Sequence, residues 1–362
     1  MFTRPLYRTQ LGAAYVGDSL LLLEELGPNS VDLVMTSPPF ALLRQKDYGN
    51  KNQDDYVDWL LAFGQAVKRV LKSSGSFVVD LGGAYEKGLP VRSLYNYRFL
   101  VRMCDDLGFH LAEEFFWHNP AKLPSPIEWV NKRKIRAKDS VNTVWWFCKD
   151  PLPKADITKV LTPYSERMQK LLANSQKYYR AKKRPSGHDV SMSFDKDNGG
   201  AIPSNLLQIP NTESNSQYLR YCKAAEVKAH SARFPSELPR FFVKMLTEPG
   251  DLVVDIFAGS NTTGEVCENL ERRWMSFELN HEFLSASSFR FVGDLSEQAA
   301  RELYERLVVS SDQDIELCSN FTVVQLDDGR SVQPLEHATQ LLLGDEQGFM
   351  ACESPEIVVV AG

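Results

Sequence analysis

The sequence has no long hydrophobic run and no paired cysteines. None of its apolar stretches reaches the roughly 20 residues that a membrane-spanning helix needs, and its first residues lack the apolar core of a secretory signal peptide. The six cysteines are widely scattered, and no two of them form a Cys-x-x-Cys pair. We therefore expect a cytoplasmic protein without a membrane segment, a metal site or a disulfide framework.

Acidic side chains slightly outnumber basic ones, but the excess is confined to the C-terminal end of the chain. The 362 residues are 43% hydrophobic and 24% charged, as in a globular protein of one large domain or two, and their formal net charge is −6. Residues 294–362 hold 14 acidic and 3 basic side chains, a net charge of −11. Residues 1–293 hold 33 acidic and 38 basic side chains, a net charge of +5, so the main part of the chain is compatible with a nucleic-acid partner.

Basic side chains gather in two polar stretches, 132–138 and 177–184. The second stretch lies within residues 151–229, where hydrophobic periodicity fades and Pro, Ser, Asn, Tyr and basic residues dominate. We interpret residues 151–229 as a loop-rich recognition region, and an ordinary solvated insertion is the alternative.

On both sides of this region, strand-like and helix-like patterns alternate. Such alternation predicts an α/β fold with a mostly parallel twisted sheet and helices on both faces. The predicted strands are 31–35, 75–81, 111–117, 141–148, 252–256 and 274–277. The predicted helices are 18–27, 54–75, 93–107, 236–246 and 295–309.

The first strand leads into the sequence Ser37-Pro38-Pro39-Phe40. The two prolines fix the backbone and remove two N–H donors, so the turn is stiff and its carbonyls have few local partners. The Ser37 hydroxyl and the Pro38 carbonyl could accept the hydrogens of a ring-bound amine while Phe40 covers the ring face. A Ser-Pro-Pro turn without any chemistry is the alternative.

A second motif lies far downstream, at 251–264. An apolar strand runs into a Gly-rich turn around Gly259 and then into a helix, an arrangement that lets backbone amides approach an adenosyl-type ligand. The next strand ends in Glu278, which is well placed to accept both hydroxyls of a ribose. The Gly-rich turn and the acid together predict a site for a nucleotide-type coenzyme.

Together the two motifs resemble those of the amino-methylating DNA methyltransferases, which use S-adenosylmethionine to methylate an exocyclic amine of a base. The catalytic turn precedes the cofactor turn, which is the permuted order of the beta group of that family. The resemblance runs from about Gly17 to Gly293 and includes Lys122–Trp129, Arg184–Asp189 and Ala232–Pro235.

The resemblance implies a Rossmann-like, S-adenosylmethionine-dependent methyltransferase fold with circularly permuted motifs. Residues 1–150 would form the catalytic half, 151–229 the target-recognition region and 230–294 the cofactor-binding half. Residues 295–362 would be an acidic C-terminal extension, to which we assign no role.

The resemblance also implies the site residues. Asp255 would face the methionine amino group, Glu278 the ribose and Asp18 the adenine amine. The full cofactor set is Asp18, Phe234, Asp255, Phe257, Ala258, Gly259, Ser260, Gly264 and Glu278. Each of the proposed DNA-binding residues taken alone could be an ordinary surface charge, and they are Lys122, Lys132, Arg133, Lys134, Arg136, Arg180, Lys182 and Lys183.

The catalytic set is Ser37, Pro38, Pro39 and Phe40, acting on a base flipped out of double-stranded DNA. Serine at the first position favours cytosine N4 over adenine N6, which stays open. Methylation of a ring carbon needs a thiolate, and no cysteine here follows a proline. A non-catalytic DNA-binding regulator that keeps the cofactor pocket is a further alternative.

If the likeness holds through residues 151–229, the expected target is the palindrome CAGCTG, methylated at its inner cytosine. Such a modification would protect the DNA from a partner restriction endonuclease, with no stable complex between the two proteins.

Overall fold

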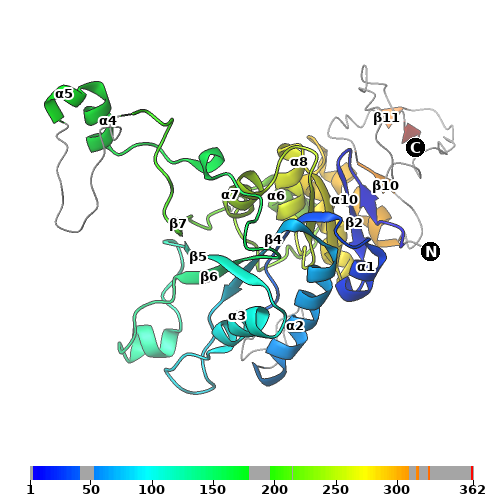
Figure 1. Cartoon of the computed structure of the whole chain (residues 1–362). Coiled ribbons are helices and arrows are strands. Elements are labelled where there is room, and N and C mark those ends of the chain that lie inside the picture. The colour runs from blue at the N-terminus through cyan, green and yellow to red at the C-terminus, as the bar shows by residue number, and fades with distance from the viewer. Residues whose placement is uncertain are drawn as a thin grey trace.

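The computed structural model describes residues 3–40, 53–178, 196–213, 215–309, 315–317, 325–326 and 360–361. Its centre is one ten-stranded sheet in the order β10-β1-β2-β9-β8-β3-β4-β6-β5-β7 (Figure 1). These strands are β1 (Tyr7–Arg8), β2 (Gly12–Val16), β3 (Val31–Thr36), β4 (Leu71–Gly82), β5 (His110–His118), β6 (Val141–Cys148), β7 (Leu206–Gln208), β8 (Leu252–Asp255), β9 (Arg273–Glu278) and β10 (Ile315–Glu316). A separate ladder pairs β11 (Gln325–Leu326) with β12 (Val360–Ala361).

The prediction of a mostly parallel sheet is confirmed. Strands β2, β9, β8, β3 and β4 are parallel neighbours, whereas β6 runs antiparallel between β4 and β5. Strands β3 and β8 lie side by side, with Leu33 opposite Val253, although they are far apart in the sequence. Because parallel strands end at the same edge of a sheet, the segments that follow β3 and β8 emerge together.

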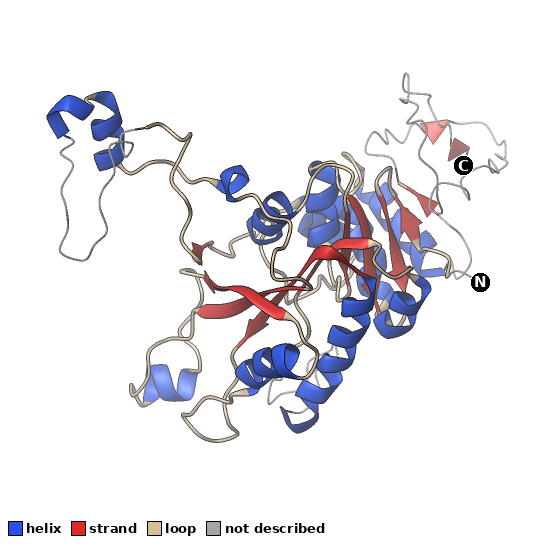
Figure 2. Cartoon of the chain, viewed as in Figure 1, coloured by secondary structure: helices blue, strands red, loops and turns tan. Residues whose placement is uncertain are grey.

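Helices cover both faces of the sheet (Figure 2). Leu33 and Met35 of β3 pack into the core on one face, and Val34 packs into the core on the other. The second face carries α1 (Ser19–Glu25), α2 (Gln53–Val70) and α3 (Tyr95–Asp105). The first carries α6 (Gln217–Ala224), α7 (Glu237–Leu246), α8 (Thr262–Asn269), α9 (His281–Ser287) and α10 (Glu297–Val309). No helix of the described residues is both long and apolar enough to cross a membrane.

One predicted boundary is wrong. The pattern predicts a helix that ends at Gly75, but α2 ends at Val70 and β4 starts at once with Leu71. The Leu71 side chain is buried and the residue pairs with Val31 at the start of β3. Strand pairing therefore takes the chain out of the helix five residues before the glycine.

The predicted recognition region is only partly separate from the sheet. Its helices α4 (Glu166–Ala173) and α5 (Ser175–Tyr178), which the periodicity did not predict, lie at the end of a long arm that leaves the body (Figure 1). Strand β7, however, returns to the sheet beside β5, and Tyr218 and Tyr221 of α6 are buried in the core. The arm is therefore the part that is free to contact a partner.

The predicted C-terminal extension also begins inside the body. The helix predicted at 295–309 is confirmed as α10, which buries Ala300 and Leu307, and β10 joins the sheet beside β1. The sequence also predicts a strand–turn–strand pattern around Asp327-Asp328-Gly329, and these three residues lie outside the described part of the chain.

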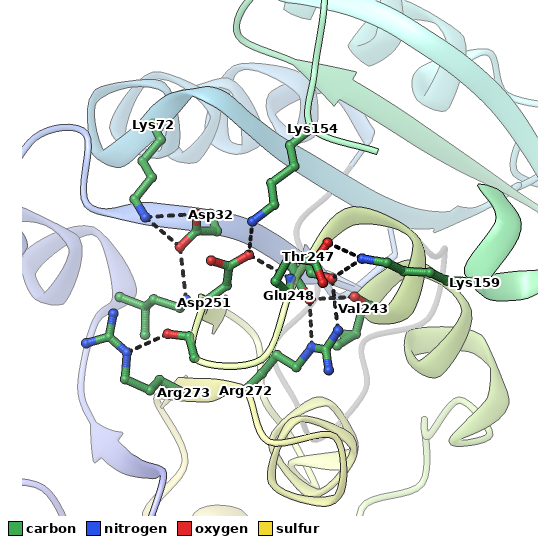
Figure 3. Close-up of polar contacts among 12 residues, drawn as sticks. Asp32, Lys72, Lys154, Lys159, Val243, Thr247, Glu248, Asp251, Arg272 and Arg273 are labelled. Carbon is green, nitrogen blue, oxygen red and sulfur yellow. Dashed lines mark hydrogen bonds and ion pairs between the residues drawn. The ribbon is translucent and has the colours of Figure 1, made fainter. Parts of the chain in front are cut away.

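A polar network lies at the amino end of β3, whereas Ser37 follows its carboxyl end. Figure 3 shows the residues of this network. Asp32, near the start of β3, is only 6% exposed, and its carboxylate oxygens accept hydrogen bonds from Lys72 Nζ at 2.9 Å and from Leu252 N at 3.0 Å. Beside it, Asp251 accepts bonds from Lys154 and from the Glu248 amide. The network ties β3, β4 and β8 to the start of the recognition region.

We expect Asp32→Ala to lower the free energy of unfolding by ~1–3 kcal/mol, because a buried amide and an ammonium group lose their acceptor. Urea denaturation followed by circular dichroism measures the change. Asp294→Ala, which removes the exposed partner of Arg220, is the matched control and should leave the urea midpoint unchanged. Equal effects of the two substitutions would contradict the role given to the network.

Candidate active site and cofactor site

One buried carboxylate fastens the two predicted motifs together. Thr36, the last residue of β3, donates its hydroxyl to Asp255 Oδ1 at 2.7 Å, and Thr263 in the first turn of α8 donates to Oδ2 at 2.6 Å. The Phe257 amide also donates to Oδ1 at 3.1 Å. Burial raises the pKa of Asp255 and the two threonine hydroxyls oppose the rise. Asp255 therefore connects the end of β3 to the Gly-rich turn and to α8.

The Gly-rich turn is held in a left-handed conformation. Gly259 has φ +51°, and a Cβ there would lie 3.0 Å from the His230 ring. Its amide donates to Glu278 Oε2 at 2.8 Å, and Glu278 Oε1 accepts the Asn280 amide at 2.9 Å. Asn261 is also left-handed, with φ 55°, and its side chain accepts the Gly264 amide at the start of α8.

These contacts form a preorganised cradle at the carboxyl edge of the sheet. Burial raises the pKa of Glu278, while the bonds from the Asn280 and Gly259 amides act against it. Each carboxylate oxygen of Glu278 has a second lone pair, so the two can still accept hydroxyl donors from a ribose. The backbone at Gly259 has no side chain in the way. The residues of the cradle therefore fit an adenosyl group.

The other predicted cofactor residues lie around the same edge. Asp18 is exposed and caps α1 by accepting the Leu20 amide at 2.9 Å, next to Gly17, whose amide bonds the Glu278 carbonyl. Phe257 packs on the rings of Trp59 and Phe63. The remaining predicted residues are Ala258 and Ser260 in the turn, Gly264 in α8 and the half-buried Phe234 just before α7.

A supporting residue that the sequence did not point to is Arg290. This side chain is 3% exposed and lies in the short helix η3 (Ser288–Arg290). Its guanidinium donates to the Ser260 carbonyl at 2.6 Å and to the Ser260 hydroxyl at 3.2 Å, and it forms an ion pair with Glu265. A lone arginine outside any motif gives no signal in a sequence, so only the fold could assign this contact.

Ser37 lies in the turn after β3 and donates its hydroxyl to Asp80 Oδ2 at 3.0 Å. Asp80 is 1% exposed in β4 and also accepts Asn142 Nδ2 at 3.1 Å. Burial raises the pKa of Asp80 to about 6, against the opposing hydrogen bonds of Asn142 and Ser37 and the charge of Lys122. Asp80 is not among the residues predicted from the sequence. An acid inside an apolar strand, shortly before two glycines, is the signal that could have marked it.

Phe40 follows the two prolines and rests on the end of β4. A Cβ on Gly82 would lie 2.3 Å from the Phe40 ring, so the ring packs directly on the glycine backbone. Ser37, Asp80 and Phe40 thus lie together beside the two strand ends that Thr36 and Asp255 join.

The predicted DNA-binding side chains differ in how strongly other groups of the protein already bind them. Glu128, at the start of the π-helix η1 (Glu128–Lys132), forms ion pairs at 3.1 Å with Lys132 and with Arg133, which follows the helix. Lys134 is exposed. Arg136 lies over the Tyr85 ring and bonds the Pro90 carbonyl, so its guanidinium is already engaged. Arg180, Lys182 and Lys183 lie outside the described residues.

A mostly parallel sheet, a cradle after β8 and β9 that fits an adenosyl group, and a polar turn after the adjacent β3 agree with the class of S-adenosylmethionine-dependent methyltransferases. The family model described as DNA methylase, which covers N6 and N4 methyltransferases, matches residues 31–289, and the chain belongs to this family. S-adenosylmethionine is its methyl donor.

Similar proteins agree with this assignment. The chain is 60% identical to Type II methyltransferase M.PvuII of Proteus hauseri over 313 residues, 86% of this chain and 93% of that protein. It is 26% identical to M.BglII of Bacillus subtilis over 277 residues, 76% of this chain and 68% of that protein. A solved structure of the PvuII DNA methyltransferase (cytosine-N4-specific) matches with a TM-score of 0.71 at 52% identity, covering 87% of this chain and 98% of that one.

We expect Gly259→Ala to weaken the binding of S-adenosylmethionine about tenfold or more, because a strained left-handed alanine costs about 1–3 kcal/mol and its Cβ meets His230. Isothermal titration calorimetry measures the change. Gly27→Ala is the control, since a Cβ there meets nothing within 4 Å. Unchanged affinity of Gly259→Ala would show that the turn does not form the cradle.

Proposed function

We propose that the chain methylates the exocyclic N4 amine of a cytosine flipped out of duplex DNA, at a short specific site. The 60% identity to M.PvuII and the match to a structure titled cytosine-N4-specific support the choice of base. The observation that carries the proposal is the hydrogen bond from the Ser37 hydroxyl to Asp80, beside the cofactor cradle.

That hydrogen bond prepares Ser37 to act as an acceptor. A hydroxyl that donates its proton to a carboxylate keeps its oxygen lone pairs for other donors. In our proposal the Ser37 oxygen and the Pro38 carbonyl each accept one hydrogen of the N4 amine, which draws the nitrogen toward a tetrahedral shape and frees its lone pair. S-adenosylmethionine, held by the cradle, supplies a methyl group on a positively charged sulfur. Phe40 stacks on the face of the flipped base, and Pro39 fixes the turn.

Asp80 gives the surplus proton of the product a destination. A methylated N4 carries one proton too many and a positive charge. In the proposed path this proton passes to the Ser37 oxygen as the Ser37 hydroxyl proton moves to Asp80. The path needs Asp80 to be ionised, and its pKa of about 6 leaves it mostly ionised at neutral pH.

We expect Ser37→Ala to bind S-adenosylmethionine normally and to lose roughly 10²–10³-fold in methyl transfer. In the wild type the rate should fall as the pH drops through about 6, where Asp80 becomes protonated. Transfer of a radiolabelled methyl group to DNA measures both effects. Ser73→Ala, at an exposed position near the start of β4, is the control. Normal turnover by Ser37→Ala would rule out its assigned role.

The recognition region, residues 151–229, is proposed to read the target through its arm, with Lys122, Lys132, Arg133 and Lys134 contacting phosphates. We further propose that the site is CAGCTG, that a cognate restriction endonuclease cleaves the same site, and that both act in the cytoplasm. M.PvuII is named a Type II methyltransferase, which supports the pairing with an endonuclease.

Methylation-sensitive sequencing of DNA from cells that express the chain should find N4-methylcytosine at the inner cytosine of CAGCTG. N6-methyladenine instead would assign the chain to the other branch of the matched family. A different sequence context would overturn the target alone, and no methylation despite cofactor binding would favour a DNA-binding regulator.

A further inference from the structure

Two loops that flank the active site are joined by a compact polar cluster. The first loop follows β4, and its residues Tyr85 and Arg92 form an isolated bridge. The second loop links β5 to β6 and carries η1. Arg92 forms an ion pair with Asp139 at 2.7 Å, and its guanidinium lies 5.4 Å from the centre of the Tyr85 ring. Arg136 lies 4.6 Å from the same ring and bonds the Pro90 carbonyl.

Asp139 closes the cluster, because its carboxylate pairs with Arg92 and lies close enough to Tyr85 for its charge, after burial, to raise the pKa of that phenol. Its side chain is only 10% exposed. We call Tyr85, Arg92, Arg136 and Asp139 the latch. Two guanidinium groups, one ring and one carboxylate thus bind each other across two loops that share no strand pairing.

The latch lies next to Gly82, the glycine on which the Phe40 ring packs. A Cβ on Gly83 would lie 1.8 Å from Arg92 Nη1, so the guanidinium rests on the backbone of Gly83. The preceding residue, Gly82, supports the Phe40 ring, and its carbonyl accepts the Tyr95 hydroxyl. Displacement of Arg92 would therefore remove a contact from the backbone next to Gly82, which supports the Phe40 ring.

The latch also fixes the basic loop between β5 and β6. Backbone bonds from Asn119 to Ser140 at 2.8 Å and from Asp139 to Ser125 at 3.0 Å close this loop into a narrow extension. Lys138 ties its two limbs by donating to the Lys122 carbonyl at 3.2 Å. Lys122 in turn lies close enough to Asp80 for its charge to lower the pKa of that carboxyl. Figure 1 shows the extension, in blue-green, beyond β5 and β6.

We propose that the latch is a positioning unit that holds the basic extension against the end of β4, so that phosphates are gripped while the flipped base enters between Ser37 and Phe40. This inference rests on the proposed function. The Arg92 side chain is 39% exposed, and an ion pair with such an exposed partner contributes little to global stability. Loss of the latch should therefore change steps that involve DNA far more than it changes folding.

The test compares Tyr85→Leu and Arg92→Gln with Tyr85→Phe, which keeps the ring for both guanidinium groups. The first two variants should lose about 10- to 100-fold in kcat/KM for DNA, since small misplacements of reacting groups have effects of that size. Tyr85→Phe should stay close to the wild type. S-adenosylmethionine affinity and the thermal midpoint should be unchanged in all three. Arg102→Gln is the control, because Arg102 is 43% exposed against 39% for Arg92 and pairs with the more exposed Asp58 and Asp106 at the C-terminal end of α3.

The pH profile separates positioning from a merely structural role. Three groups face Asp80: Ser37 from the turn after β3, Asn142 from β6 and Lys122 from the extension. A loosened extension takes the Lys122 charge away, which raises the pKa of Asp80. The acid limb of the rate profile in Arg92→Gln should therefore move to higher pH, whereas Arg102→Gln should keep the wild-type profile.

Two results would overturn the latch. One is wild-type kcat/KM and an unshifted acid limb in both disruptive variants. The other is a fall in the thermal midpoint of both Tyr85→Leu and Arg92→Gln that is large enough for unfolding to explain all of their lost activity. If the wild type itself transfers no methyl group, the proposed function fails separately. The latch is then tested by fluorescence anisotropy with a labelled duplex, where Arg92→Gln should bind more weakly than Arg102→Gln, and equal affinities would refute it.

Discussion

The parallel pairing of β3 with β8 is the constraint on which the site depends. It brings Ser37 and Gly259 to one edge of the sheet, and the bond from Thr36 to Asp255 fixes the two strand ends although 219 residues separate them. The entropy of closing so long a connection grows only slowly with length, by ~0.6 kcal/mol for each doubling. The order of motifs along a chain can therefore be permuted at small cost, provided that the strands meet in the same sheet order.

Three carboxylates at this edge, the buried Asp80 and Asp255 and the partly buried Glu278, have different tasks because they have different partners. Both oxygens of Asp255 are occupied by donors from β3, the turn and α8, so the side chain serves first to hold the backbone. A role of Asp255 toward the methionine amino group stays a prediction, and Oδ2, which among the described residues accepts only Thr263, keeps a lone pair for it. Glu278 accepts one amide on each oxygen and keeps a lone pair on each. Asp80 alone is bonded to the hydroxyl of the proposed catalytic turn.

The sequence predicted those parts of the fold that leave a local pattern. Strands β3 and β8, the long helix α2 and the turn at Gly259 all follow from apolar periodicity or from glycine and proline. The three-residue strand β7 is too short to show a period, and α6 lies in a polar stretch that looked like loop. Asp80 and Arg290 were missed for another reason. Their roles come from partners 43 and 30 residues away, and no local pattern encodes such contacts.

The charge of the basic extension illustrates the same limit. Read from the sequence, 132–136 offers four cations to DNA. In the fold, Lys132 and Arg133 share Glu128, and Arg136 stacks on Tyr85. Because salt dependence of DNA binding reports the number of phosphates that are neutralised, an extension with few free cations gives a shallow dependence. The extension then neutralises fewer phosphates than its four cations suggest, and it contributes by the placement of its charges more than by their number.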